Sequence, residues 1–174
     1  STVSANLACA LARAGAKVGL LDADVYGPSL PIMLGIKRAM LLTTEDHKLI
    51  PMERCGVKIM SVGLLLGDSH KSLLIMDLPP GTGDIQMSLG QLAPISGAVI
   101  VSTPQDLALN VAVKAVDLFK ALKVPIAGLI ENMSYYVCPK CGDRQDIFGT
   151  NGAENMSKEL QVPLLGAVPL EIGI

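Results

Sequence analysis

The stretch "SLLIMDLPPGTGD", residues 72–84, joins an apolar strand to an unusual loop. Its apolar residues run without a break, which predicts a strand buried on both faces. Asp77 ends this strand, where a carboxylate can hold Mg²⁺ through water. The loop that follows contains Pro79, Pro80, Gly81 and Gly83. A plain turn does not need so particular a pattern, so we interpret the loop as one that senses the terminal phosphate of a nucleotide.

A second strand ends in the same way. "AKVGLLDAD", residues 16–24, is a continuous apolar run that ends in Asp22 and Asp24. Two carboxylates at a strand end can bind Mg²⁺ through water or orient an attacking water molecule. The alternative is a helix cap or a solvated turn, and this stretch alone does not choose between the two.

Apolar strands alternate with amphipathic helices along the rest of the chain. Further strands are predicted at 97–104, 125–133 and 163–169, and helices at 1–15, 106–122 and 152–160. This alternation is typical of a mostly parallel sheet with helices on both faces. In such sheets, ligands bind at the carboxyl ends of the strands. We therefore expect an α/β fold in a single domain, 1–174, with Ser1, Asp24 and Asp77 in one pocket.

The composition excludes several classes of protein. Half of the 174 residues are hydrophobic, 17% are charged and the net charge is −2. We expect no nucleic acid partner, because there is no basic field, and no membrane partner, because every apolar run is too short to span a bilayer. We also expect no secretory signal. The four cysteines do not form a disulfide framework. A reducing compartment follows, the cytoplasm or an organelle matrix.

One junction is too short for the expected fold. "GVKIMSVG", residues 56–63, and the strand that begins at residue 72 are separated by only a few residues. Parallel neighbours need a crossover of roughly a dozen residues or more. Either the two strands form an antiparallel hairpin or a segment is missing near 63–72. We favour a missing segment and predict a chain break or disorder between Gly63 and Ser72.

The segment "YYVCPKCGD", residues 135–143, contains two cysteines at metal-ligand spacing, Cys138 and Cys141. A tetrahedral sulfur site or a [4Fe–4S] cluster needs four ligands. Cys9 lies on an apolar helical stripe and Cys55 has no partner at ligand spacing, so both are poor candidates for the other two. The pair is idle, or it is a redox couple, or a second chain completes the site in a two-fold dimer.

The motifs together resemble the deviant-Walker-A branch of the P-loop NTPases, the class of MinD and ParA. Within that branch, the closest resemblance is to the Mrp/ApbC family of iron–sulfur cluster carrier ATPases. The motifs that carry it, in the family's order, are "LLDADVYGPSLP", "DLPPGTGD", "STPQD", "GLIENMS" and "CPKC". The resemblance runs from Ser1 to about Glu171 and implies a P-loop NTPase fold.

The resemblance implies a role for each residue near the phosphates. Ser1 would place its hydroxyl on Mg²⁺, and Thr2 would contact a phosphate of ATP or ADP. Asp77 would hold Mg²⁺ through water, and Gly81 would lie near the γ-phosphate. The family's phosphate loop would precede Ser1, and its helical crossover would precede the strand at 72–77. We expect both to be absent from this chain.

The resemblance also implies catalytic and metal-binding residues. Asp24 would position the hydrolytic water, with Asp22 beside it. Asn132 would recognise adenine through its amide, which both donates and accepts hydrogen bonds. Cys138 and Cys141 would hold the cluster, in a metal site shared by a homodimer. Zinc is expected in its place after handling in air, because thiolates also suit zinc.

The leading hypothesis is an ATPase that assembles a [4Fe–4S] cluster and transfers it to apo iron–sulfur proteins. The rival is a positioning ATPase of the MinD/ParA kind with a structural zinc site. That rival does not need a CxxC pair and usually has a basic surface or an amphipathic tail. A third alternative is a zinc-stapled domain without catalytic work.

Overall fold

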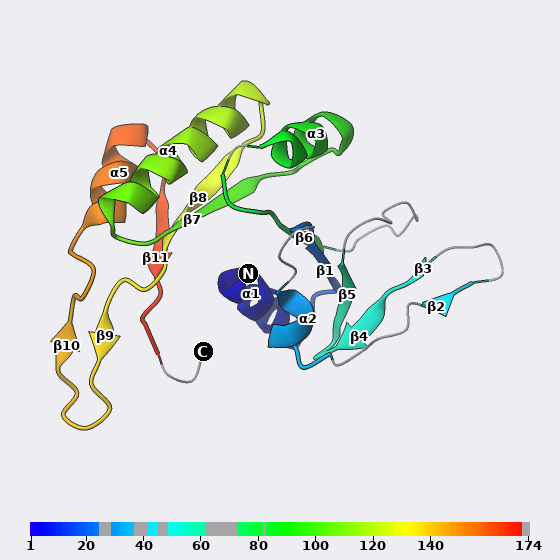
Figure 1. Ribbon diagram of the computed structural model, residues 1–174, viewed down its shortest axis with the longest axis horizontal. Helices are drawn as coiled ribbons and strands as arrows, with labels where there is room; N and C mark the ends of the chain where they lie inside the picture. Colours follow the sequence, from blue (N-terminus) through cyan, green and yellow to red (C-terminus); the bar gives the residue numbers. More distant parts are fainter. Residues whose placement is uncertain (25–28, 37–41, 45–48, 62–72, 82, 172–174) are drawn as a thin grey trace. The chain divides into compact units, whose positions relative to one another are not determined.

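The computed structural model describes six parts of the chain: residues 1–24, 29–36, 42–44, 49–61, 73–81 and 83–171 (Figure 1). The chain divides into two compact units, Ser1–Pro79 and Pro80–Ile174. Each unit contains its own sheet. Among the described residues, none of the helices combines the length and apolar character needed to cross a lipid bilayer.

The first unit is built on a four-stranded sheet in the order β4-β5-β1-β6. Its elements are α1 (Thr2–Arg13), β1 (Val18–Asp22), α2 (Leu30–Met33), β2 (Leu42–Thr43), β3 (Leu49–Ile50), β4 (Met52–Arg54), β5 (Val57–Ser61) and β6 (Leu73–Asp77). β1 is parallel to both β5 and β6, whereas β4 pairs antiparallel with β5. β2 and β3 form a separate antiparallel pair.

α1 packs on this sheet through small side chains. Ala5 and Ala8 are buried against strand residues of β1 and β5, in a cluster that also contains Leu30 of α2. The helix ends at Arg13 with Ala14 as its C-cap, and Gly15 follows with a φ of +91°. This left-handed conformation is the usual way for a helix to stop, and it favours glycine. The predicted first helix and its glycine stop are therefore confirmed.

The short junction noted in the sequence has a different explanation from an antiparallel hairpin. β5 and β6 are not neighbours, because each pairs in parallel with a different edge of β1. The hairpin alternative is wrong for this reason. The linking residues, 62–72, lie outside the described part of the chain, and so does the predicted break between Gly63 and Ser72.

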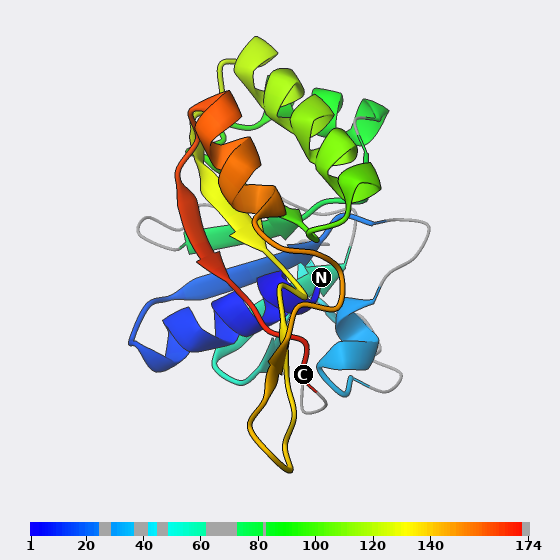
Figure 2. The ribbon, with the colours of Figure 1, turned by 90° about the vertical axis from the view of Figure 1, so that its left-hand side faces the viewer.

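The second unit is built on a three-stranded parallel sheet in the order β11-β8-β7. Its elements are α3 (Asp84–Leu92), β7 (Ala98–Ser102), α4 (Asp106–Ala121), β8 (Ile126–Glu131), β9 (Tyr136–Val137), β10 (Arg144–Gln145), α5 (Gly152–Leu160) and β11 (Leu164–Ala167). β9 and β10 pair antiparallel. Figure 2 shows this hairpin extending from the end of β8. The predicted α/β fold with mostly parallel strands is confirmed.

Burial of the strands differs from the expectation drawn from their apolar runs. The strand at 72–77 was expected to be buried on both faces, which is wrong at its beginning, because Leu73 and Leu74 of β6 are 48% and 42% exposed. β7 is also an apolar run, yet its residues alternate: Ile100 is buried, while Val99 and Val101 are 41% and 44% exposed. α4 packs on β7, and α4 and α5 pack on each other. The side chains of Val99 and Val101 therefore remain partly open to solvent. An apolar run alone does not reveal this difference between the faces.

A close backbone approach in the second unit provides a test of its packing. A Cβ added at Gly128 of β8 would lie 2.6 Å from the Pro163 carbonyl oxygen and 2.5 Å from Leu165 Cγ. We expect Gly128→Ala to destabilise the unit by about 1–3 kcal/mol, as overpacking usually does. Gly166→Ala on β11 is the control, because nothing lies within 4 Å of an added Cβ there. Urea unfolding followed by circular dichroism measures both, and equal stability of the two variants would contradict this packing.

Candidate functional site

Two buried carboxylates lie side by side at the carboxyl ends of β1 and β6. Asp22 and Asp77 are register partners on these adjacent parallel strands. Asp22 is fully buried and Asp77 is 7% exposed. Buried carboxylates need hydrogen-bond donors or a cation to offset the loss of water. The donors around each one therefore indicate what each carboxylate does.

Asp77 is held against the beginning of α1. Its Oδ1 accepts a hydrogen bond of 2.9 Å from the Ser4 hydroxyl and lies 3.3 Å from the Ser1 nitrogen. Its backbone oxygen accepts a 2.9 Å bond from the Ala23 N–H. The sequence analysis missed Ser4, although Ser4 lies three residues after Ser1 and hence one turn further along the same helix face.

Asp22 organises the segment that follows β1. Its Oδ1 accepts a 3.1 Å hydrogen bond from the Asp24 N–H, and its Oδ2 accepts a 3.3 Å bond from the Leu30 N–H at the start of α2. Both oxygens of Asp22 thus bind backbone. Asp24 is half-buried at the beginning of the same segment.

These residues form a group of oxygens suited to a hard cation. Mg²⁺ prefers carboxylates, hydroxyls and water at near-octahedral positions. Ser4 and Asp77 place a hydroxyl and a carboxylate at one end of the sheet, with Ser1 beside them through its nitrogen, and Thr2 is the first residue of α1. The chemistry of this donor set therefore fits the magnesium role that the sequence suggested for Ser1 and Asp77.

Two further predicted nucleotide residues belong to the second unit. Gly81 has a φ of +97°, which favours glycine, and its carbonyl accepts a 3.1 Å bond from Gln86 Nε2 in α3. Asn132 follows β8 directly and is half-buried. Its backbone N–H donates a 2.7 Å bond to the Ser102 carbonyl at the end of β7. Asn132 therefore lies at the end of a parallel strand, where ligands bind in such sheets, and Gly81 lies in the loop that precedes α3.

The cysteine pair occupies the tip of the β9–β10 hairpin. The Cys138 N–H donates a 2.9 Å bond to the Asp143 carbonyl, and the Gly142 N–H donates a 2.8 Å bond to the Cys138 carbonyl. Gly142 has a φ of +74°. This tight turn therefore requires a residue that adopts the left-handed backbone conformation, which glycine does without steric cost. At the base of the hairpin, the Arg144 guanidinium stacks 4.1 Å from the centre of the Tyr135 ring.

The turn alters the acidity of one thiol. The backbone N–H groups of Cys141 and Lys140, and the Cys141 side chain, hydrogen-bond to the Cys138 sulfur and lower the pKa of this thiol. Such bonds stabilise the thiolate, which is the form that binds metals. Cys141 is exposed and Cys138 is partly exposed. The pair therefore fits the role of an accessible metal ligand pair.

The other two cysteines meet in the first unit, which the sequence analysis missed. Burial raises the pKa of Cys9, and so does the neighbouring Cys55 thiol through its charge and a hydrogen bond. The two are distant in sequence, so no local spacing signals their proximity. Within the described ranges, no group of three or more His, Cys, Asp or Glu residues is arranged to hold a metal ion.

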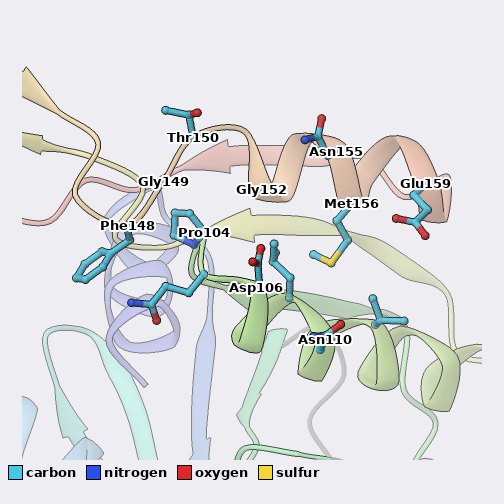
Figure 3. A pocket seen from close by; sticks show the side chains of 13 residues that line it. Pro104, Asp106, Asn110, Phe148, Gly149, Thr150, Gly152, Asn155, Met156 and Glu159 are labelled. Atoms are coloured by element: carbon cyan, nitrogen blue, oxygen red, sulfur yellow. The ribbon is translucent and has the colours of Figure 1, made fainter.

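A groove of about 950 Å³ lies in the second unit, lined by the N-terminal half of α4, the length of α5 and the loop at 148–150 (Figure 3). Its polar lining includes Asp106 and Asn110 of α4 and Asn155 and Glu159 of α5. Sequence reasoning did not predict this groove, because its two walls come from separate helices that only the fold brings together.

The opposite pKa shifts of the Cys138 and Cys9 thiols predict different rates of alkylation. The thiolate is the nucleophile in alkylation, so the rate rises with pH through the pKa of each thiol. We expect the pH midpoint for iodoacetamide labelling of Cys138 to lie below that of Cys9, because hydrogen bonds lower the first pKa and burial raises the second. Peptide mass spectrometry measures both rates in one sample. In urea-unfolded protein the midpoints should converge, and coinciding midpoints in the folded protein would contradict the assignment.

Comparison with known proteins connects these features to a family. The family model described as "ParA: NUBPL iron-transfer P-loop NTPase" matches residues 1–74 and 70–174. The iron–sulfur cluster carrier protein of Deinococcus radiodurans is 46% identical over 198 residues, which cover all of this chain and 56% of the relative. That relative therefore has at least 24 positions (198 − 174) without a counterpart here. The chain spans about half the length of the curated relatives that it matches.

Solved structures agree with this result. A nucleotide-binding protein from Archaeoglobus fulgidus in complex with ADP superposes with a TM-score of 0.84 and 34% identity, over 99% of this chain and 76% of that one. MinD from Pyrococcus horikoshii, with Mg-ADP, has a TM-score of 0.71 and 22% identity, over 98% of this chain and 75% of that one, which shows the fold alone. Because the family match extends from the first residue to the last, the chain belongs to the NUBPL iron-transfer branch of the ParA-type P-loop NTPases.

Proposed function

We propose that this chain is the core of an ATP-dependent iron–sulfur cluster carrier, which assembles a [4Fe–4S] cluster and passes it to apo-proteins. The observation that carries this proposal is the Cys138–Cys141 turn, whose backbone N–H groups favour the thiolate in a chain of the iron-transfer family. Relatives are named iron–sulfur cluster carriers, and a neighbouring structure contains ADP. The cluster is the cargo of this protein and would be held for release.

The cluster site requires a second copy of the chain. One turn supplies two thiolates, whereas a [4Fe–4S] cluster takes four. The described residues offer no third ligand near the pair. In a two-fold dimer the same hairpin meets itself, so each chain contributes Cys138 and Cys141. An exposed turn is suited to this arrangement and to handing the cluster on. Zinc would occupy the same thiolates in aerobically handled protein.

The first unit would hold the magnesium and the attacking water. Ser1 and Asp77 would hold Mg²⁺, directly or through water, and Ser4 would orient Asp77. Asp22 would hold the backbone of Asp24 in place through the Asp24 N–H. Asp24 would orient the hydrolytic water. Bound ATP would supply the phosphoanhydride bond that is cleaved. In the second unit, Gly81 and Asn132 would contact the γ-phosphate and the adenine.

We also infer that a segment between β5 and β6 is absent from this chain. The family match divides at residues 70–74, and the Deinococcus relative has at least 24 extra positions (198 − 174) within the matched region. Both observations support the expectation raised by the short junction near 63–72. We propose that residues 1–174 form a single NTPase domain in which the segment near 63–72 is missing.

The rival role, a positioning ATPase of the MinD kind, is less well supported. The likeness to MinD is at 22% identity and concerns the fold. That role gives no reason for a thiolate-stabilising turn at Cys138. All four cysteines are free thiols in the structure. We therefore propose a reducing location, the cytoplasm or an organelle matrix.

The shared cluster site is tested by removing one ligand. We expect Cys138→Ser to abolish metal binding and metal-dependent dimerisation and to leave nucleotide binding unchanged, because the substitution alters none of the residues proposed to hold the nucleotide or its magnesium. Anaerobic reconstitution, metal analysis and light scattering measure these properties. Cys55→Ser, at the exposed cysteine of the first unit, is the control. If Cys138→Ser still binds one metal centre per two chains, the shared site is wrong.

The role of Asp24 is tested by comparing binding with turnover. We expect Asp24→Ala in the full-length protein to lower ATP hydrolysis much more than ATP affinity, since a water-orienting carboxylate acts mainly in the transition state. Phosphate release and calorimetric titration give the two quantities. Asp117→Ala, on the exposed face of α4, is the matched control. Equal loss of binding and turnover in Asp24→Ala would refute the role.

A further inference from the structure

Glu131 is a buried carboxylate that none of the roles above uses. It ends β8 and is 7% exposed. Its position repeats that of Asp22 and Asp77, since each acid terminates a parallel strand. Buried carboxylates of this kind are strongly hydrogen-bonded, and the partners reveal their purpose.

The two oxygens of Glu131 bind the two ends of the segment 134–153, which contains the cysteine hairpin. Oε2 accepts a hydrogen bond from the Ser134 hydroxyl, where the chain leaves the sheet toward the cysteine hairpin. Oε1 accepts a 2.9 Å bond from the Ala153 N–H, where the chain returns in the first turn of α5. A single side chain therefore joins the departing and returning ends of the segment that carries Cys138 and Cys141.

The returning end has no local substitute for this contact. Asn151, the residue that precedes α5, makes no side-chain hydrogen bond to the helix and has a φ of 60°. α5 also cannot shift easily, because a Cβ added at Gly152 would lie 2.7 Å from the Pro104 carbonyl oxygen. A carboxylate beside a helix N-terminus is favourable in itself. Glu131 is thus anchored to a rigid element on one side.

Backbone hydrogen bonds also hold Ser134 and Tyr135, where the chain leaves the sheet. The Ser134 N–H donates to the Val168 carbonyl at 2.9 Å, and the Leu170 N–H donates to the Tyr135 carbonyl at 2.7 Å. The Ser134 hydroxyl adds a side-chain hydrogen bond, to Glu131, to these two backbone bonds. Figure 1 shows the chain running from β8 into the β9–β10 hairpin and on to α5.

We propose that Glu131 is a positioning residue, whose buried carboxylate sets the orientation of the cysteine hairpin by joining Ser134 to the first turn of α5. This inference rests on the proposed function, because orientation matters when two hairpins must present four thiolates to one cluster. In a two-fold dimer any error in one hairpin occurs twice. Residues that orient metal ligands typically contribute about 10–100-fold to metal affinity.

Ser134→Ala is the decisive variant, because it removes the link to the hairpin and retains the Glu131 bond to α5. We expect amide hydrogen exchange at residue 134 and at Leu170 to accelerate by about five- to tenfold, the effect of one buried hydrogen bond. Exchange at Ala153 and at Gly142, inside the cysteine turn, should stay unchanged. Zn²⁺ affinity, measured anaerobically with a chromophoric competitor, should fall by about tenfold.

Two further variants separate orientation from a general loss of stability. Glu131→Gln keeps the shape: its carbonyl can accept from Ala153 while its NH₂ donates to the Ser134 hydroxyl. We expect it to retain both the exchange pattern and the Zn²⁺ affinity, whereas Glu131→Ala loses both. Glu154→Gln, an exposed residue of α5 paired with Lys158, is the control.

The outcomes distinguish this inference from the proposed function. If the unaltered protein binds no Zn²⁺ through Cys138, the proposed function fails, while the exchange measurement still decides the role of Glu131. If the unaltered protein binds Zn²⁺ and Ser134→Ala changes neither exchange nor affinity, Glu131 only caps α5 and the inference is overturned.

Discussion

A carboxylate buried at the end of a parallel strand must find hydrogen-bond donors, and this constraint shapes the functional parts of the protein. Asp22, Asp77 and Glu131 each end a strand and are each at most 7% exposed. The donors come from the segments that continue beyond the strands or pack against them. Satisfying each buried acid therefore orders a loop or a helix end at the same time.

The three acids differ in what they order. Asp22 accepts hydrogen bonds from the backbone N–H groups of Asp24 and Leu30, two described residues that follow β1. Asp77 is bound by Ser4 and lies near the Ser1 nitrogen, and it faces the end of α1 where a cation would be shared. Glu131 joins Ser134 to Ala153, the two ends of the segment that contains the cysteine hairpin. The same physical rule thus applies in both units.

The cysteine turn follows a related principle with sulfur in place of oxygen. Its backbone N–H groups converge on Cys138, and they stabilise the thiolate through hydrogen bonds. In contrast, Cys9 is partly buried beside another thiol, so its pKa moves in the opposite direction. Accessibility and backbone geometry, more than the number of cysteines, therefore distinguish the pair suited to metal from the pair that is not.

Much of this protein is determined by local sequence. Periodicity located the first helix, α4, α5 and the main strands, because side chains repeat with the geometry of each element. The acids that end strands and the CxxC spacing are likewise visible in short segments, as are the motifs that led to the family. Even so, a run of apolar residues did not reveal that Val99 and Val101 would be exposed.

Tertiary structure alone decided which distant residues meet. It placed β1 between β5 and β6, where the sequence had left a hairpin open. It brought Ser4 to Asp77, Cys9 to Cys55, and Ala153 to Glu131. The physical reason is that strand register and helix packing are set by burial across the whole unit, whereas periodicity reports only the residues within one helix or strand.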